Sequence, residues 1–384
     1  MASKSSSSFN VVIVGAGIMG LGIAWRLGQR GARVTLFDAG RAGGGASHAA
    51  AGMLAICAEA EPGEQALVAL GRASQALWPQ FAAELEGLTG ESVDLRREGT
   101  LLVALTADDQ ARICHHLAFQ KGLDLPVEWI SAAETRRREP HLAARLAGAV
   151  ASPEDLQVDN RKVVAALRTA AERSGATIHE HRAVERILVT DGRATGVRLR
   201  DASEVGADVV VLAAGAWSRG LEGLPAALRP PVRPVKGQLI SLRMDPQAPL
   251  VRHVVRALNV YLVPRLDGRL ILGATSEEKG FDRTLTAGGM LALLEAAWRL
   301  VPAIEELPID EMWVGHRPGS RDDAPILGAA PVDGLVYATG HSRNGILLAP
   351  VTVDAIARLV LDGEVVPAIR PFGMERFVPA RAAE

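Results

Sequence analysis

Three glycines near the start of the chain are spaced for binding a dinucleotide. They belong to the motif Gly15-Ala16-Gly17-Ile18-Met19-Gly20, which follows a β-rich apolar run at residues 9–14 and opens a helical pattern. This strand, turn and helix is the context that a GxGxxG motif requires. The first glycine permits the tight turn, the second lets the backbone approach a pyrophosphate, and the third allows close packing of helix on strand. We therefore predict a diphosphate at this helix N-terminus.

Asp38 strengthens this prediction. It directly follows a second buried-type strand, expected at 32–37, so the first residues of the chain form one βαβ unit. A carboxylate at this place accepts a hydrogen bond from the ribose 2′-OH of an adenosine and repels a 2′-phosphate. The alternative is a structural glycine turn followed by a surface aspartate. The glycine motif lies between a strand and a helix, and Asp38 follows the next strand. Together these two features favour dinucleotide binding.

Two further segments indicate which dinucleotide is bound. Residues 43–53, GGGASHAAAGM, are mostly small, as a backbone must be where it lies against a large flat ligand, although a flexible loop is the alternative. Residues 207–218, ADVVVLAAGAWS, predict a buried strand that ends in a small-residue turn at Ala213, Ala214 and Gly215. Both segments resemble those that FAD-dependent amine oxidases place along the flavin. FAD is therefore favoured over NAD.

Longer motifs carry a more specific resemblance, which covers nearly the whole chain. They are AAAGML at 49–54, PVKGQ at 234–238, VYLVPR at 260–265, LILGAT at 270–275, GHRPGSRDDAPILG at 315–328 and GHSRNGILLAPVT at 340–352. With them the chain resembles the glycine oxidases of thiamine (thiazole) biosynthesis, within the D-amino-acid oxidase and sarcosine oxidase superfamily. The resemblance implies FAD, an amine or amino-acid substrate, oxygen as acceptor and an imine product.

The expected fold is α/β, with a Rossmann-like FAD-binding domain and an inserted antiparallel-sheet (α+β) substrate domain. A length of 384 residues already favours two domains. Nucleotide-fold segments occur at both ends and in the middle of the chain, so the second domain is inserted twice. We assign 9–55, 150–230 and 313–384 to the FAD-binding domain and 56–149 and 231–312 to the substrate-binding domain.

Two residues suit recognition of an amino-acid carboxylate. Arg317, in HRPG, is expected just past a strand, and its planar guanidinium can bind a carboxylate through two parallel hydrogen bonds. Tyr261, in VYLVPR, is one of only 2 tyrosines and can donate to the same carboxylate. From the residues alone, a surface or interdomain salt bridge for Arg317 and core packing for Tyr261 are the commoner roles. The resemblance implies that both hold the substrate carboxylate.

Arg343, in HSRNG, falls between the last expected strand and the final helix, which we expect to begin at Asn344 or Gly345. The resemblance places it near flavin and substrate, while a solvated arginine beside a capped helix is the alternative. Backbone amides around Asn344, Gly345 and Ile346 are suited to an anionic flavin ring, because a helix N-terminus favours negative charge.

The resemblance also implies a full set of residues that contact FAD. They are Gly15, Gly17, Ile18, Met19, Gly20, Asp38, Ala46, Ser47, Ala51, Gly52, Met53, Val184, Ala213, Ala214, Gly215, Trp217, His341, Arg343, Asn344, Gly345, Ile346 and Leu347. Some relatives tether the flavin through a histidine near residues 43–53, but His48 is one residue out of that register. Sarcosine oxidases use a cysteine in the C-terminal half, and no cysteine follows Cys114. We expect non-covalent FAD.

Composition narrows the partners. Lys+Arg 42 against Asp+Glu 44 gives a net charge of −2, so we expect neither nucleic acid nor an anionic membrane surface as a partner. Neither a secretory signal, a membrane-spanning apolar run nor a metal-binding spacing of Cys and His is recognisable, and a cytoplasmic location fits the 2 cysteines. By family resemblance we expect a homo-oligomer, a tetramer.

The expected activity is flavin-dependent oxidative deamination of glycine or another small amine or amino acid, with ammonia and hydrogen peroxide as products. One alternative is an oxidase or dehydrogenase of D-amino acids or N-methyl amino acids such as sarcosine. Another is a non-catalytic protein that retains the FAD fold. Asn259 and Ser276 stand where the resembling family has a histidine and a methionine, which leaves the substrate preference open.

Overall fold

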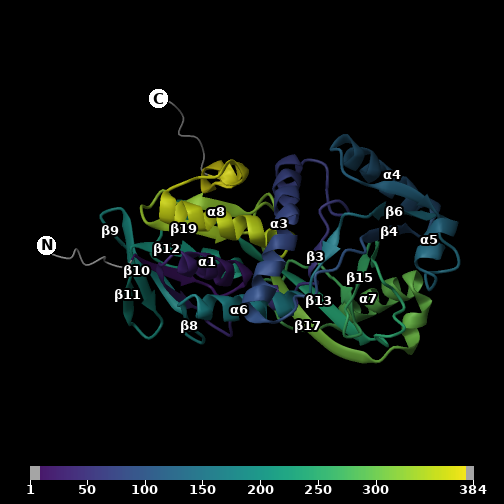
Figure 1. Ribbon diagram of the computed structural model, residues 1–384, viewed down its shortest axis with the longest axis horizontal. Coiled ribbons are helices and arrows are strands. Elements are labelled where there is room, and N and C mark those ends of the chain that lie inside the picture. Colours follow the sequence, from purple (N-terminus) through teal and green to yellow (C-terminus); the bar gives the residue numbers. More distant parts are fainter. Residues whose placement is uncertain (1–8, 378–384) are drawn as a thin grey trace.

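The structure is a computed structural model that describes residues 9–377. Two β-sheet units lie side by side along the long axis of the molecule, with helix α3 (Gln65–Thr89) between them in the view of Figure 1. A six-stranded sheet forms one unit and an eight-stranded sheet forms the other. The expected α/β fold with a Rossmann-like core and a separate antiparallel sheet is confirmed.

The six-stranded sheet creates a natural ligand-binding edge. Its order is β18-β19-β12-β1-β2-β8, and all neighbours pair in parallel except β18 with β19. The strands are β1 (Asn10–Val14), β2 (Arg33–Phe37), β8 (Thr177–His179), β12 (Val209–Leu212), β18 (Ile326–Ala329) and β19 (Leu335–Thr339). From β1 the chain adds β2 and β8 on one side, then β12 and β19 on the other. Ligands of such sheets bind where the order reverses, at the carboxyl ends of the strands.

Alternating side chains explain why this sheet is covered on both faces. Val11 and Ile13 of β1 belong to a core with helices α1 (Ile18–Gln29), α3, α6 (Asn160–Arg173) and α8 (Ala349–Asp362). Val12 and Val14 instead pack toward a three-stranded sheet of β9 (Val184–Thr190), β10 (Arg193–Leu199) and β11 (Glu204–Gly206). Because successive strand residues point to opposite faces, the continuous apolar run of β1 is buried on both sides.

The eight-stranded sheet has the order β17-β13-β16-β15-β14-β4-β6-β5. Its strands are β4 (Thr100–Ala104), β5 (Glu128–Ser131), β6 (Gly148–Ser152), β13 (Arg233–Arg243), β14 (Val254–Ala257), β15 (Val260–Pro264), β16 (Arg269–Gly273) and β17 (Ile309–Gly319). Helix α7 (Ala287–Leu300) buries Leu293 and Ala297 against one face. The opposite face packs Leu239 and Val263 against Ala51 of the segment that follows β2.

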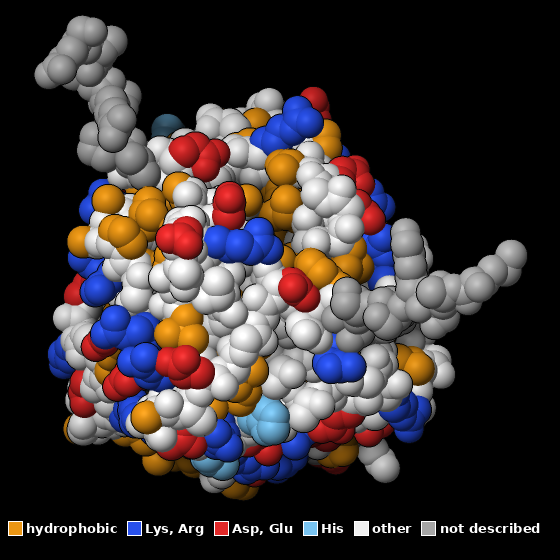
Figure 2. All heavy atoms as spheres, turned by 90° about the vertical axis from the view of Figure 1, so that its left-hand side faces the viewer, with side chains coloured by type: hydrophobic (Ala, Val, Ile, Leu, Met, Phe, Trp, Pro, Cys, Tyr) orange, Lys and Arg blue, Asp and Glu red, His pale blue; other side chains and the backbone are white. Residues whose placement is uncertain are grey.

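The remaining helices and short strands complete the described chain. They are α2 (Ala46–Ala49), β3 (Met53–Leu54), α4 (Ala107–Gly122), α5 (Ala132–Arg138), β7 (Leu156–Gln157), η1 (Gly215–Gly220), η2 (Ala226–Leu228), η3 (Pro302–Glu306), η4 (Ser342–Asn344), η5 (Pro367–Phe372) and η6 (Met374–Phe377). None of the helices in residues 9–377 is long and apolar enough to cross a membrane. On the face in Figure 2, acidic and basic side chains are interspersed.

Two local expectations need correction. Arg317 lies within β17 and not past its end. The last helix begins at Ala349 and not at Asn344 or Gly345, with Pro350 in its first turn, where a missing N–H costs least. The domain bounds given above stay a prediction; β17 and β6 each cross one of them while pairing within the eight-stranded sheet.

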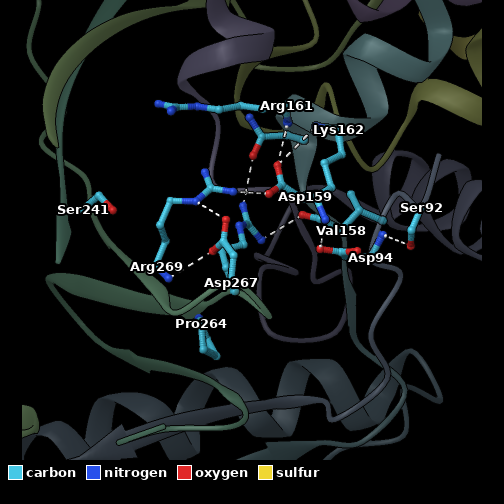
Figure 3. A network of polar contacts seen from close by, with 12 residues as sticks. Ser92, Asp94, Val158, Asp159, Arg161, Lys162, Ser241, Pro264, Asp267 and Arg269 are labelled. Atoms are coloured by element: carbon cyan, nitrogen blue, oxygen red, sulfur yellow. Dashed lines mark hydrogen bonds and ion pairs between the residues drawn. The ribbon is translucent and has the colours of Figure 1, made fainter. Parts of the chain in front are cut away.

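A polar network ties α6 to the eight-stranded sheet (Figure 3). The side chain of Asp159 caps α6 by accepting from the amides of Arg161 at 2.9 Å and Lys162 at 3.3 Å. The same carboxylate forms an ion pair with Arg269 of β16, and only 1% of the Asp159 side chain is exposed. Arg269 Nε also contacts Asp267 Oδ2 at 2.8 Å, at the sheet surface. Asp159 therefore serves one helix terminus and one buried charge pair.

Replacing Asp159 with alanine should lower the free energy of unfolding by about 3 to 5 kcal/mol, because Arg269 loses its buried partner and α6 loses its cap. Asp267→Ala is the matched control, since it removes the exposed partner of the same arginine and should cost about 1 kcal/mol or less. Urea unfolding followed by circular dichroism measures both. Equal losses in the two variants would contradict this assignment.

The Asp159 effect should also depend on pH. Although burial alone would raise it, the charges of Arg265 and Arg269 hold the pKa of Asp159 below its ordinary value. A carboxylate with a lowered folded-state pKa stabilises the fold above its unfolded pKa, about 4, and loses this contribution as pH falls through the folded value. The stability gap between the protein and Asp159→Ala should therefore narrow below about pH 4.

Candidate functional site

The turn after β1 is built so that backbone approaches backbone. Gly15 has a φ of +102°, and a Cβ there would lie 2.5 Å from the carbonyl oxygen of Ala213. A Cβ at Gly20 would lie 1.9 Å from the oxygen of Gly15. Side chains are therefore excluded where β1, β12 and α1 converge. This is the point at which the strand order reverses.

Backbone amides and a fixed carboxylate surround that turn. Gly17 is the N-cap residue of α1 and provides no side-chain cap, and the amide of Ile18 donates to Ser47 Oγ at 3.0 Å. Asp38 Oδ2 accepts from the amide of Ala16 at 2.8 Å, and Asp38 Oδ1 accepts from Gly40 at 2.8 Å. Each carboxylate oxygen retains a further lone pair for a ligand hydroxyl. The arrangement fits a diphosphate at α1 and a ribose at Asp38.

The segment after β19 supplies a second set of donors. The backbone amides of Ile346 and Leu347 have no acceptor among residues 9–377, although both residues are buried. Asn344, just before them, donates its amide to the oxygen of His341. Buried amides are nearly always paired, so two successive orphans indicate a missing acceptor. The carbonyl oxygens and ring nitrogens of a flavin are acceptors of this kind, and the residues present therefore fit FAD.

A buried arginine holds the small-residue segment that follows β2. Arg265 Nη2 donates to the oxygen of Ala51 at 2.6 Å and to Asn160 Oδ1 at 3.0 Å, while Nη1 donates to Val158 O at 2.8 Å. Asn160 Nδ2 in turn donates to the oxygen of Ser47 at 2.8 Å. Burial lowers the pKa of Arg265 to about 10, so it stays charged at neutral pH. Reasoning from the sequence missed this role, although Arg265 ends the quoted VYLVPR motif.

Arg317 and Tyr261 come together on the face of the eight-stranded sheet that packs toward Ala51. A Cβ at Gly237 would lie 2.7 Å from Arg317 Nη1, and a Cβ at Gly273 would lie 2.4 Å from the Tyr261 hydroxyl. The two glycines thus give room for the guanidinium and the ring to lie flat across the sheet. Arg317 Nη1 also donates to the oxygen of Thr275 at 3.1 Å, which fixes its orientation.

The electrostatics of this pair suit a carboxylate ligand. Burial raises the pKa of the Tyr261 phenol above its ordinary value, against the opposing charge of Arg317. The hydroxyl therefore stays protonated at neutral pH and can donate a hydrogen bond. Arg317 makes no ion pair with a carboxylate among residues 9–377. A partly buried guanidinium without a countercharge is a strong site for an anionic ligand.

Arg343 has a partner of its own. Its Nη2 contacts Glu64 Oε1 at 2.8 Å and Oε2 at 2.7 Å, in the residues just before α3. Burial raises the pKa of Glu64 above its ordinary value, and Arg343 opposes that shift. The pair links the residue before α3 to η4. The charge of Arg343 is therefore neutralised within the chain, unlike the charge of Arg317.

The remaining predicted residues lie around the same edge. Ala46, Ser47, Ala51, Gly52 and Met53 belong to the segment held by Arg265, and Ala214 and Gly215 follow β12. His341 is buried with Nε2 3.2 Å from Thr352 Oγ1, and burial lowers its pKa to about 3, so the ring is neutral.

Two more predicted residues lie in elements that adjoin this edge. The amide of Arg182, two residues before Val184, donates to the oxygen of Asp38 at 2.8 Å, and a Cβ at Gly45 would lie 3.7 Å from the ring of Trp217. Val184 begins β9 of the three-stranded sheet. Trp217 is half exposed and stacks on Phe281 with ring centroids 5.0 Å apart. Within residues 9–377, no group of three or more His, Cys, Asp and Glu side chains is placed to hold a metal ion.

Known proteins share this sequence and architecture. The family model described as FAD dependent oxidoreductase matches residues 10–359. The chain is 39% identical to glycine oxidase of Geobacillus kaustophilus over 373 residues, 96% of this chain and 97% of that protein. A crystal structure of glycine oxidase from Geobacillus kaustophilus matches with a TM-score of 0.89 at 37% identity, over 98% of this chain and 100% of that one.

Two further relatives differ in their names. The bifunctional protein ThiO/ThiG of Trichormus variabilis is 37% identical over 375 residues, 96% of this chain and 55% of that longer protein. The crystal structure of iminodiacetate oxidase from Chelativorans sp. BNC1 matches with a TM-score of 0.85 at 29% identity, over 94% of this chain and 98% of that one. Family match, identity and fold agree with the glycine turn and the orphan amides: the chain belongs to the FAD dependent oxidoreductase family, and FAD is its cofactor.

Proposed function

We propose that the protein oxidises glycine with FAD and molecular oxygen, as a glycine oxidase that supplies thiazole formation in thiamine biosynthesis. Glycine loses two electrons to become an imine, oxygen is reduced to hydrogen peroxide, and water converts free imine to glyoxylate and ammonia. The observation that carries the proposal is the unpaired Arg317 beside the protonated Tyr261, on the sheet face toward the FAD-binding segment. The similarity to glycine oxidase and to ThiO/ThiG supports it.

The protein's own residues bind and orient the substrate. The guanidinium of Arg317 takes the carboxylate through its fork, and the Tyr261 hydroxyl donates to the same group. FAD, when bound, supplies the redox chemistry by accepting two electrons from the substrate amine and passing them to oxygen. Fixing the carboxylate leaves the Cα of glycine little freedom, and such orientation supplies much of the rate in reactions of this kind.

No side chain of the described site is arranged as a proton acceptor for the substrate amine. His341 is neutral, but it is buried against Thr352. The carboxylate of Glu64 is held by Arg343. The amine therefore binds in its neutral form or loses its proton to water. Asn259 and Ser276, at the positions expected to line the pocket, are exposed. Because they stand where the resembling family has a histidine and a methionine, a D-amino acid or sarcosine is the alternative substrate class.

Several finer points belong to this proposal. FAD is bound without a covalent link, because the free Cys57 and Cys114 precede the C-terminal half and His48 is out of register. The FAD-contacting residues are those of the predicted set, with Arg317, Tyr261 and Arg343 near the substrate. The domains divide at the bounds given from the sequence, and the protein is a cytoplasmic homotetramer.

A substrate panel tests the proposed function. Glycine, sarcosine, D-alanine and L-alanine are incubated in air with the purified yellow protein, and hydrogen peroxide and ammonia are measured. We expect glycine to give the highest kcat/KM, with peroxide and ammonia formed in equal amounts. A protein that binds FAD but is not reduced by any of these amines under anaerobic conditions would overturn the proposal.

Replacing Arg317 with alanine should remove the principal countercharge of the substrate. Truncating one partner of a buried charge pair costs about 2 to 5 kcal/mol, so kcat/KM for glycine should fall by about 30- to several-thousand-fold. Arg317→Lys should recover only part, because it keeps the charge and loses the fork. Steady-state kinetics with unchanged flavin content provide the check. If kcat/KM for glycine in Arg317→Ala stays within a factor of a few of the original value, Arg343 becomes the candidate residue for binding the substrate carboxylate.

Replacing Asp38 with alanine tests the cofactor site. The variant loses one charge-assisted hydrogen bond to the ribose, worth about 1.5 to 3 kcal/mol, so the dissociation constant of FAD should rise by about ten- to 150-fold. Acid precipitation first establishes that all flavin is released from the protein, and fluorescence titration of the apoprotein then gives the affinity. Unchanged affinity would show that Asp38 does not contact the ribose.

A further inference from the structure

A second arginine shares the sheet face of Tyr261. In the register of the antiparallel strands, Tyr261 of β15 lies opposite Gly273 of β16 on one side and opposite Arg256 of β14 on the other. Residues directly opposite in adjacent strands project from the same face, about 5 Å apart. The Tyr261 hydroxyl lies over Gly273, toward β13 and Arg317, so Arg256 flanks the opposite side of the tyrosine. Two guanidinium groups therefore bracket one phenol.

Arg256 is masked by a carboxylate from another part of the chain. Its Nη1 donates to Glu59 Oε1 at 2.8 Å, and both side chains are mostly buried. Arg256 Nε is buried and has no hydrogen-bond partner among residues 9–377. Leaving a buried charged donor unpaired is costly, so the single contact with Glu59 does not satisfy this guanidinium. It has unused capacity for a second anion.

The segment that carries Glu59 is held from outside the site. The buried carboxylate of Asp155 accepts from the amides of Cys57 at 2.9 Å and Ala58 at 3.2 Å, and Gln120 Nε2 donates to Cys57 O at 2.8 Å. Residues 57–58 are thus anchored independently of the Arg256 contact. Glu59 can exchange its partner without release of the whole segment.

The charges of these groups reach the same phenol. After burial, Arg317, Glu59 and Arg256 are the charges that act most strongly on the pKa of Tyr261. A substrate carboxylate held by Arg317 and Tyr261 therefore lies in the field of Arg256 and Glu59 as well. For a substrate with one carboxylate, the two opposite charges of Arg256 and Glu59 largely cancel. In a substrate with a second carboxylate, Arg256 attracts that carboxylate. Glu59 repels it and competes with it for the guanidinium of Arg256.

We propose that Arg256 is a second anion-recognition residue of the substrate site, and that Glu59 occupies it and thereby disfavours amino acids that carry a second carboxylate on their nitrogen. This inference rests on the proposed function and names what limits its substrate range. Iminodiacetate is the matching chemistry, since it is glycine with a carboxymethyl group on nitrogen. Sarcosine carries a neutral methyl group there instead. The fold of iminodiacetate oxidase, shared by this chain, supports the choice of this substrate class.

The first experiment compares Glu59→Gln with the unmodified holoenzyme. The kcat/KM for iminodiacetate divided by that for sarcosine should rise about ten- to a hundredfold, because the variant removes a repulsive charge and frees Arg256. Glu61→Gln is the matched control: it makes the same charge change two residues away, and Glu61 is exposed. Its ratio should stay within about twofold. An unchanged ratio in Glu59→Gln, or an equal rise in both variants, would overturn the proposal.

The second experiment assigns the effect to Arg256. Adding Arg256→Met to Glu59→Gln should remove the gain for iminodiacetate, and a gain that survives would overturn the proposal. Equilibrium binding of oxydiacetate and methoxyacetate provides a readout without turnover. These ligands match iminodiacetate and sarcosine in shape, and their binding is followed by the flavin absorbance. The preference for oxydiacetate should rise in Glu59→Gln and fall in Arg256→Met alone.

The binding experiment also separates this inference from the proposed function. Failure of every amine to reduce the flavin would reject glycine oxidation, yet the oxydiacetate preference would still report on Arg256. If Glu59→Gln does not fold, Arg256→Met alone decides, because an unchanged preference for oxydiacetate would contradict a role for this arginine. Normal glycine kinetics with an unaltered dicarboxylate preference in both variants would reject only the inference drawn here.

Discussion

Burial of the Arg265 guanidinium between the two sheet units is the constraint on which the rest of the site depends. The residue directly follows β15, the strand that carries Tyr261, and it bonds three groups around the segment after β2. A buried guanidinium must find acceptors for its donors, since each unmet donor costs about 1 to 3 kcal/mol or more. The carbonyls of Ala51 and Val158 supply acceptors for Nη1 and Nη2 only when the two units are correctly placed, while Nε has no partner among residues 9–377.

This contact joins the small-residue segment to the strand that carries Tyr261. The segment lies against one side of Arg265, and β15, which carries Tyr261, ends directly before this arginine. The Asp159 and Arg269 pair reinforces the same junction one strand farther on. The six-stranded sheet then presents its glycine turn and orphan amides, while the eight-stranded sheet presents Arg317. Each unit thus carries part of the candidate site, and the contacts of Arg265 and Asp159 join the two units.

The site also requires free space above the eight-stranded sheet, where Arg317 and Tyr261 lie. Gly237 and Gly273 leave the surface of the eight-stranded sheet bare where Arg317 and Tyr261 lie. A long side chain extended over bare backbone is held on one side by the sheet, which reduces the freedom it must lose on binding. This arrangement explains why glycines occur inside β13 and at the end of β16, where they would otherwise weaken the sheet.

Local pattern and spacing were sufficient for the first βαβ unit, because the turn glycines and Asp38 are close in sequence and their roles follow from backbone geometry. Arg317 and Tyr261 were identified only through the resemblance, since their meeting depends on strand order. The bidentate pairing of Arg343 with Glu64 was not foreseen, because it joins residues 279 positions apart. The same holds for Arg256 and Glu59, whose relation to Tyr261 rests on strand register, and register is not visible in an isolated strand.

The central claim is that a carboxylate bound by Arg317 and Tyr261 places the substrate against FAD. A crystal structure of the holoenzyme with glycolate, which has the carboxylate of glycine and lacks its amine, tests the claim directly. Our account predicts two hydrogen bonds from the Arg317 guanidinium and one from the Tyr261 hydroxyl to the glycolate carboxylate, with the Arg343 and Glu64 pair intact. A carboxylate bound to Arg343, with Glu64 displaced and Arg317 free, would contradict it.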